Sequence, residues 1–243
     1  MTATAGTPTS TLFNGPKMIT FDGDQTLYSD GANFDSNPRL ANYLYLLLKH
    51  GVTVAVVTAA GYEYKTEKYE LRLSGLLAYF SEKKLSPADC ERFYLFGGEC
   101  NYLLNLGSDY KLHAVKETGP GGWCTSTRYI SEAPANWSDE DVKTLLDTAE
   151  ASVRESMEDQ HLRSRIIRKK RSVGLIPRPD SEIPREALDE AVLRVQAKLS
   201  SMNGGKGPPL PFCAFNGGRD VWVDAGNKRV GVHILQSYLG IPI

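Results

Sequence analysis

Net charge, long apolar runs and cysteine pairs are all scarce in this chain of 243 residues. Its 28 basic residues nearly balance its 29 acidic ones, so the composition does not support a general role in binding nucleic acid or a membrane surface. No stretch approaches the roughly 18 consecutive apolar residues of a membrane span. The four cysteines form no CxxC pair and show no metal-ligand spacing. We therefore expect reduced thiols in an intracellular, cytoplasmic protein.

The start of the chain, MTATAGTPTST, also lacks the basic flank and the apolar segment of a secretory signal. We expect a flexible lead-in over residues 1–16. The whole chain is 41% hydrophobic and 23% charged, which is typical of a globular protein rather than of a disordered chain or a coiled coil. Its length suits one large domain or two small ones.

Three short apolar runs rich in β-forming residues predict buried strands. They are KMITFD (17–22), VTVAVVT (52–58) and RFYLFGG (92–98). Helical spacing of apolar residues separates them, first after Asn37 and then over residues 62–80. This alternation predicts βαβ units and a parallel sheet, with a ligand site at the carboxyl ends of the strands. The loops that follow the three strands should therefore share one crevice.

The middle of the chain, residues 107–226, differs from what precedes it. It starts with a polar, Gly/Pro-rich stretch, which indicates a boundary. Amphipathic segments predict helices after Ser138 and Pro184. FCAFNGGRDVWVDAG (212–226) alternates around a Gly-Gly turn and predicts a β-hairpin. We expect an α+β insert, followed by a return to the core with a helix.

The sharpest chemical signal is the pair Asp22 and Asp24, directly after an apolar strand. Two carboxylates this close need a cation to remain ionised together, and Mg²⁺ is the natural choice because it prefers oxygen ligands and brings phosphate with it. Gly23 lets the backbone turn sharply between them. The alternative is an acidic turn without function, but the apolar strand and the βαβ pattern argue against it.

Two further positions fit a phosphate site. Thr58 ends the second strand and is followed by Ala59 and the start of a helical segment, where free backbone N–H groups can bind phosphate. The alternative for Thr58 is a plain helix cap. Lys228 follows the insert and precedes a core-like helix, so it can re-enter the crevice and neutralise phosphate charge. Its alternative is a solvated loop lysine.

Asp22/Asp24, Thr58 and Lys228 resemble, in this order, the first three signature motifs of the haloacid-dehalogenase (HAD) phosphatase superfamily. The hairpin-plus-lysine stretch is also similar to that of phosphomannomutases. A closer resemblance is to the IMP-specific 5′-nucleotidase family, from about residue 17 to 241. The strings that carry it are TFDGDQTLYSDG, VVTAAGY, GGECNYL, RKKRSVGLIP and LPFCAFNGGRDVWVDAGNKRVGV.

The resemblance implies a fold and a division into domains. The fold class is α/β, a HAD-like Rossmannoid parallel-sheet core with an inserted α+β C2-type cap. The core would comprise residues 17–106 and 227–243, and the cap residues 107–226. The basic run within RSRIIRKKR (163–171) is then interpreted as a cap strand with one solvated face rather than as a nucleic-acid patch.

The resemblance also assigns roles by position. Asp22 would be the nucleophile that forms an aspartyl-phosphate, and Asp24 the general acid and base. Mg²⁺ would be held by the Asp22 carboxylate and the Asp24 backbone carbonyl. Thr58, Ala59 and Lys228 would bind phosphate oxygens and stabilise the charge of the transferring group.

Four more residues resemble substrate contacts of the family, namely Asp30, Arg72, Trp222 and Asp224. For three of them the residues alone also suggest a plainer structural alternative. Asp30 suits a turn, Arg72 a solvated helix face, and Trp222 the apolar core of the cap. Base specificity comes from the family likeness alone.

The family also has segments that this sequence does not show. A fourth, acidic motif that supplies a Mg²⁺ carboxylate lies downstream of the lysine, whereas this chain ends at Ile243. The other segment is an N-terminal helical region, which in the family is linked to ATP as an allosteric effector. The expectation is a fragment, a shortened gene model or a degenerate copy.

The expected function is Mg²⁺-dependent hydrolysis of IMP, or a related purine 5′-monophosphate, to nucleoside and phosphate, in purine nucleotide and inosine metabolism. A HAD phosphomutase and a sugar phosphatase remain as alternatives. A third is a non-catalytic nucleotide-binding remnant, because the fourth motif is missing from this sequence. A homo-oligomer is left open, and neither nucleic acid nor membrane is expected as a partner.

Overall fold

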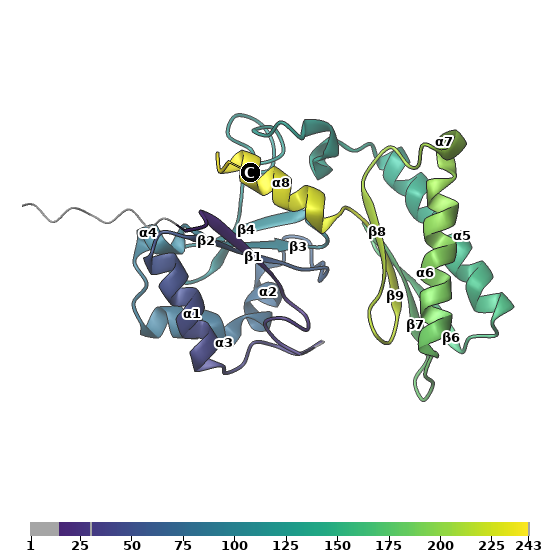
Figure 1. Cartoon of the computed structure of the whole chain (residues 1–243), viewed down its shortest axis with the longest axis horizontal. Helices are drawn as coiled ribbons and strands as arrows, with labels where there is room; N and C mark the ends of the chain where they lie inside the picture. Colours follow the sequence, from purple (N-terminus) through teal and green to yellow (C-terminus); the bar gives the residue numbers. More distant parts are fainter. Residues whose placement is uncertain (1–14, 30, 243) are drawn as a thin grey trace, which may run out of the picture.

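The computed structural model describes residues 15–29 and 31–242, which form two α/β units side by side (Figure 1). The first unit, the core, contains a five-stranded sheet of order β1-β2-β3-β4-β5. Its first three strands run parallel, and β4 and β5 are each antiparallel to the strand before them. The bounds are β1 (Met18–Asp22), β2 (Thr53–Val57), β3 (Phe93–Gly97), β4 (Tyr102–Leu106) and β5 (Leu112–Ala114).

Helices cover both faces of the core sheet (Figure 1). One face carries a large apolar cluster with α1 and α3, and the other carries α8 together with the loop that follows β5. The sheet is therefore buried on both sides, as its continuous apolar strands require. The bounds are α1 (Pro38–Lys49), α2 (Thr66–Arg72), α3 (Ser74–Glu82), α4 (Pro87–Cys90) and α8 (Lys228–Tyr238).

The predicted helix over residues 62–80 is two helices in the structure, α2 and α3, separated at Leu73. The loop around Phe34 causes the break. Its N–H donates to the carbonyl of Arg72 at 2.7 Å, and its carbonyl accepts from the N–H of Gly75 at 2.8 Å. A continuous helix would use these groups internally. Periodicity within the helix does not reveal a crossing segment from elsewhere in the chain.

The second unit, the cap, is a four-stranded antiparallel sheet of order β6-β7-β9-β8. Two long helices cover the face that points away from the core, and their apolar sides close a separate hydrophobic cluster (Figure 1). The elements are α5 (Asp139–Asp159), β6 (Ser164–Arg168), β7 (Ser172–Pro177), α6 (Arg185–Ser200), α7 (Met202–Gly205), β8 (Phe212–Asn216) and β9 (Val221–Ala225). The predicted hairpin over 212–226 and the cap strand within the basic run are confirmed.

The start of the cap differs from the expected position at residue 107. Strand β5 pairs with β4 in the core sheet. Trp123 is buried in the core cluster and makes an edge-to-face contact with Phe96 at 5.1 Å between ring centroids. Two short 3-10 turns, Ile130–Glu132 and Pro134–Asn136, complete this segment. The Gly/Pro-rich composition resembles a linker, but the buried tryptophan fastens the stretch to the core, so the cap unit starts at about α5.

All four cysteines are free thiols, and burial raises the pKa of Cys124 to about 12. Across the described ranges, no helix has both the length and the apolar character needed to cross a membrane. The expected lead-in, residues 1–16, lies outside the described residues except for its last two.

The seating of α8 on the core sheet leads to a stability prediction. A Cβ added at Gly231 would lie 2.1 Å from the Cβ of Cys100, so the helix can approach this closely only with glycine. We expect Gly231→Ala to lower the free energy of unfolding by about 1–3 kcal/mol through overpacking. Urea unfolding measures it, with Gln236→Ala on the same helix as the control. Equal stability of the Gly231 variant and the wild type would contradict this packing.

Candidate active site

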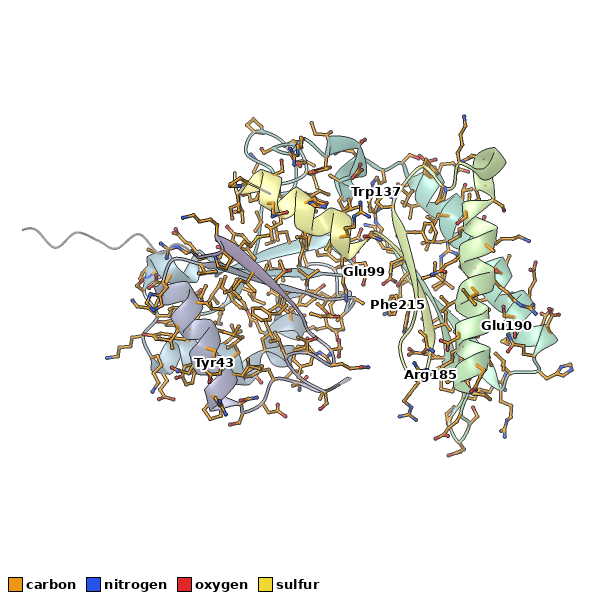
Figure 2. The ribbon with its side chains drawn as sticks, viewed as in Figure 1. Tyr43, Glu99, Trp137, Arg185, Glu190 and Phe215 are labelled. Carbon is orange, nitrogen blue, oxygen red and sulfur yellow. The ribbon has the colours of Figure 1, made fainter. Side chains whose placement is uncertain are left out.

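A cleft of about 1220 Å³ lies between the core and the cap. On the core side it is lined by the loops that follow β1, β2 and β3, and on the cap side by the β6–β7 turn and the β8–β9 hairpin. Figure 2 labels Glu99 on the core side and Phe215 on the cap side of this region. The crevice expected at the carboxyl ends of the parallel strands is therefore present, and the cap forms its opposite wall.

Asp22 and Lys228 form an ion pair at the centre of the core wall. The Lys228 ammonium lies 3.0 and 3.1 Å from the two carboxylate oxygens of Asp22. Asp22 ends β1, and Lys228 is the first residue of α8, whose N-terminus is capped by the Asn227 side chain. The Asp22 side chain is 44% exposed, so the carboxylate remains accessible from the cleft.

Asp24 is held by a second ion pair. Its Oδ1 accepts from the Arg72 guanidinium at 2.5 Å and from the Gly31 N–H at 3.0 Å. The Arg72 side chain is only 12% exposed and lies over the ring of Tyr28 at 4.8 Å. It lines the cleft rather than a solvated helix face. Asp30, the other expected substrate contact of this region, lies outside the described residues.

Thr58 lies beside the aspartate loop and is 2% exposed. Its hydroxyl accepts from the N–H of Ala60 at 3.1 Å, and its own N–H donates to the carbonyl of Phe96 at 3.0 Å. Ala59, Ala60 and Gly61 line the cleft directly. The expected helix start after Thr58 is wrong, because the next helix, α2, begins only at Thr66, and Thr58 itself is not among the residues that line the cleft. The segment presents small residues and loop backbone beside the two aspartates, and the Thr58 hydroxyl acts within it as a cap for the N–H of Ala60.

Glu99 is a site residue that the sequence reasoning did not single out. It follows β3, is 2% exposed, and its Oε2 accepts from the backbone N–H of Lys228 at 3.2 Å. Its Oε1 lies 3.6 Å from the Lys228 ammonium. Burial raises the pKa of Glu99, and the positive charge of Lys228 opposes that rise. The available signal was an acidic residue just after the third parallel strand, in a loop already expected to border the crevice.

The cap contributes Trp222 and Asp224 from β9. The ammonium of Lys169 lies 4.2 Å from the centre of the Trp222 ring, a cation–π distance. Gly174 makes room for this ring, since an added Cβ would lie 2.7 Å from it. Trp222 is only partly buried and lines the cleft, so it is not a residue of the apolar cap core.

Asp224 is a buried carboxyl group, 5% exposed. Burial, with the charge of Glu99 as a smaller cause, raises its pKa to about 8, although Lys169 and a hydrogen bond from Ser172 oppose the rise. At neutral pH the group is therefore mainly protonated and can both donate and accept hydrogen bonds. It borders the same cleft as Trp222.

The site offers few ligand atoms for a divalent cation, and the ones it offers are oxygen atoms. Within the residues that the structure describes, no three or more His, Cys, Asp or Glu side chains group into a metal site. The Asp22 carboxylate and the Asp24 backbone carbonyl supply oxygen only. Mg²⁺ commonly takes one or two carboxylates and completes its octahedron with water and substrate phosphate. The donor set fits such an ion shared with a phosphorylated ligand, and it does not form an all-protein cage.

Comparison with known proteins gives consistent matches. A family model described as IMP-specific 5′-nucleotidase matches residues 3–242. IMP-specific 5′-nucleotidase 1 of Neurospora crassa is 39% identical over 230 residues, covering 94% of this chain and 52% of the relative. The protein of that name from Plasmodium falciparum is 35% identical over 241 residues, covering 95% and 51%. The chain spans about half the length of the curated relatives it matches.

Solved structures of the Plasmodium falciparum IMP-nucleotidase are also similar. An N-terminally truncated form with bound IMP has a TM-score of 0.82 and 36% identity, over 95% of this chain and 57% of that one. An ATP-bound form has a TM-score of 0.78 and 36% identity, over 95% and 51%. Fold and site together define an α/β protein with an inserted cap and an acidic strand-end site, as the resemblance implied. The chain belongs to the IMP-specific 5′-nucleotidase family.

The raised pKa of Asp224 predicts a pH dependence of stability. The folded chain keeps a proton that the unfolded chain releases near the ordinary aspartate pKa of 3.8, so this group's contribution to stability is lost as the pH rises from about 4 to about 8. The substitution Asp224→Asn removes this titrating carboxyl group. We expect the variant to gain stability relative to the wild type across this window, by up to about 1.4 kcal/mol per pH unit.

Urea unfolding of both proteins between pH 4 and pH 8.5 provides the measurement. Asp180→Asn, at an exposed turn of the cap, is the control for the loss of a cap carboxylate. If the difference between the Asp224 variant and the wild type stays constant across the window, Asp224 is not a buried proton-holding group.

Proposed function

We propose that this chain carries the phosphoryl-transfer site of a Mg²⁺-dependent nucleotidase that hydrolyses IMP to inosine and phosphate. The observation that carries the proposal is the convergence of Asp22, Asp24 and Lys228 beside the Thr58 turn, in a chain of the IMP-specific 5′-nucleotidase family. Hydrolysis of an anionic ester needs a nucleophile, a proton donor and positive charge at the same place, and Asp22, Asp24 and Lys228 would supply them in turn.

In the first half of the reaction, an Asp22 carboxylate oxygen attacks the phosphorus of the 5′-phosphate. The bond from phosphorus to the ribose O5′ breaks, and Asp24 gives its proton to that oxygen as inosine leaves. In the second half, Asp24 takes a proton from a water molecule that attacks the aspartyl-phosphate. Phosphate leaves, and the Asp22 carboxylate is restored.

Both aspartates form ion pairs with cationic side chains in the structure, and the substrate phosphate would have to compete for these cations. Lys228 contacts both oxygens of Asp22, and Arg72 contacts Asp24. A phosphate bound between them offers these cations stronger acceptors, which frees one Asp22 oxygen to attack. Engagement of Arg72 by substrate likewise frees Asp24 to carry the transferred proton.

Mg²⁺ held by the Asp22 carboxylate and the Asp24 backbone carbonyl would neutralise charge on the phosphoryl oxygens. The chain's own part is to place these two oxygens at the end of β1, with Gly23 between them. The N–H of Gly23 donates to Asp22 Oδ1 at 2.7 Å, which fixes the rotation of that carboxylate.

The cap wall supports a purine nucleotide as substrate. The Trp222 ring, with the Lys169 ammonium over it, borders the cleft where it can contact an aromatic base, and protonated Asp224 offers a donor and an acceptor for polar groups of that base. The solved Plasmodium relative has been captured with IMP and with ATP. For this chain we propose IMP as substrate and ATP as effector, with a place in purine nucleotide and inosine metabolism.

The nucleophile assignment is tested with Asp22→Asn. Because an amide cannot form the aspartyl-phosphate, phosphate release from IMP should fall by about 10³-fold or more. Release should depend on Mg²⁺ and stop with a chelator, and IMP should exceed AMP, GMP and hexose phosphates. Asp180→Asn, the same change at an exposed cap turn, should keep wild-type activity.

Each alternative would give a different result in this assay. Return of the phosphoryl group to a sugar, without free phosphate, would indicate a phosphomutase. Preference for hexose phosphates would indicate a sugar phosphatase. Binding of IMP without turnover at high Mg²⁺ would indicate a nucleotide-binding remnant. Full activity of the Asp22 variant would refute the proposed mechanism.

A further inference from the structure

The buried carboxylate of Glu99 has no part in the proposed reaction, yet it contacts Lys228 twice. One oxygen accepts from the Lys228 backbone N–H at 3.2 Å, and the other lies 3.6 Å from its ammonium. Glu99 does not line the cleft, and it is 2% exposed. It can therefore act on the substrate only through the lysine.

The backbone around Glu99 is fixed from three directions. Its N–H donates to the carbonyl of Thr58 at 3.2 Å, which joins it to the end of β2. The side-chain amide of Asn101 donates to the carbonyl of Ala225 at 2.6 Å, which joins the same loop to the end of β9. A Cβ at Gly226 would lie 2.5 Å from the Glu99 carbonyl, so this approach requires glycine.

The loop is also strained in a manner typical of functional sites. Glu99 and Cys100 are consecutive non-glycine residues with positive φ angles, 53° and 68°. Each such residue costs energy and persists only where the surrounding structure imposes it. The strain aims the Glu99 side chain at the first turn of α8, where a carboxylate also interacts favourably with the helix dipole.

The two carboxylates that contact Lys228 differ in whether they can release the lysine. Asp22 is accessible from the cleft and must give up the ammonium when phosphate arrives. Glu99 is buried and keeps its bond to the Lys228 N–H whatever the ammonium contacts. Without Glu99, only Asp22 would hold the ammonium, and the N-terminus of α8 would lose its charged acceptor.

We propose that Glu99 is a positioning residue that holds the backbone and ammonium of Lys228 in place for phosphate, a role that rests on the proposed function. Glu99 contacts neither substrate nor the reacting atoms. A displaced lysine should lower the rate of the chemical step, because misplacement by about 1 Å can cost on the order of 100-fold. Affinity for the nucleoside part of the substrate, which the cap provides, should change little.

Three variants of the full chain test this role. Glu99→Ala removes both contacts, and Glu99→Gln keeps an acceptor for the N–H but loses the charge. Glu91→Gln, at an exposed carboxylate of the core, is the matched control. We expect Glu99→Ala to lower kcat for IMP by roughly 10- to 100-fold with KM within about twofold. Glu99→Gln should fall between it and the wild type, and the control should match the wild type.

An activity-independent readout is the amide proton of Lys228 in the NMR spectrum. Its bond to a carboxylate should place it downfield and protect it from hydrogen exchange. Glu99→Ala should move it upfield and speed its exchange, with Glu99→Gln again between. Folding of each variant is checked by circular dichroism, and Glu99→Gln decides the matter if Glu99→Ala does not fold.

The results separate the two proposals. If the wild type does not hydrolyse IMP, the proposed function fails, while the Lys228 amide still reports on Glu99. An unchanged Lys228 amide in a folded Glu99 variant would overturn the positioning role, as would an unchanged kcat in an active enzyme. A rise in KM alone, with kcat kept, would overturn it too, because it would assign Glu99 to ground-state binding.

Discussion

The ion pair between Asp22 and Lys228 joins residues 206 positions apart in the sequence, and the rest of the site is arranged around it. One partner ends the first strand of the core, and the other begins the last described helix. Formation of this pair requires that the chain, after the inserted cap, re-enter the core beside the end of β1. The fold can thus be understood as a means of bringing a carboxylate and an ammonium to the same strand ends.

Charge balance at this point is close. Asp22, Asp24 and Glu99 face Lys228 and Arg72, while the raised pKa of Asp224 keeps that carboxyl group mainly neutral at pH 7. A buried site with more unpaired anions would be costly. Under the proposed function, a dianionic phosphate would add further negative charge at this point, and a cation that arrives with the substrate would offset that charge.

Much of this could be predicted from the sequence, because strand-end motifs are local. The three parallel strands, the cap hairpin, and the meeting of Asp22 with Lys228 at one edge follow from short patterns and their order. Two features could not be predicted because they depend on contacts between distant segments. The stretch around Trp123 resembles a linker until its ring packs on Phe96, and Glu99 meets Lys228 only when α8 docks against its loop. The periodicity of apolar residues predicts the structure of one segment at a time, whereas both of these features arise from contacts between two segments.

The connection between β9 and α8 has a mechanical consequence. Only Gly226 and Asn227 separate the last cap strand from Lys228, and Gly226 has a φ angle of 121°, a conformation that side-chain-bearing residues rarely adopt. A movement of the cap relative to the core would therefore displace Lys228, unless rotation about Gly226 absorbs that movement. Cap opening would in this way also move the Lys228 ammonium away from the phosphate that we propose it binds.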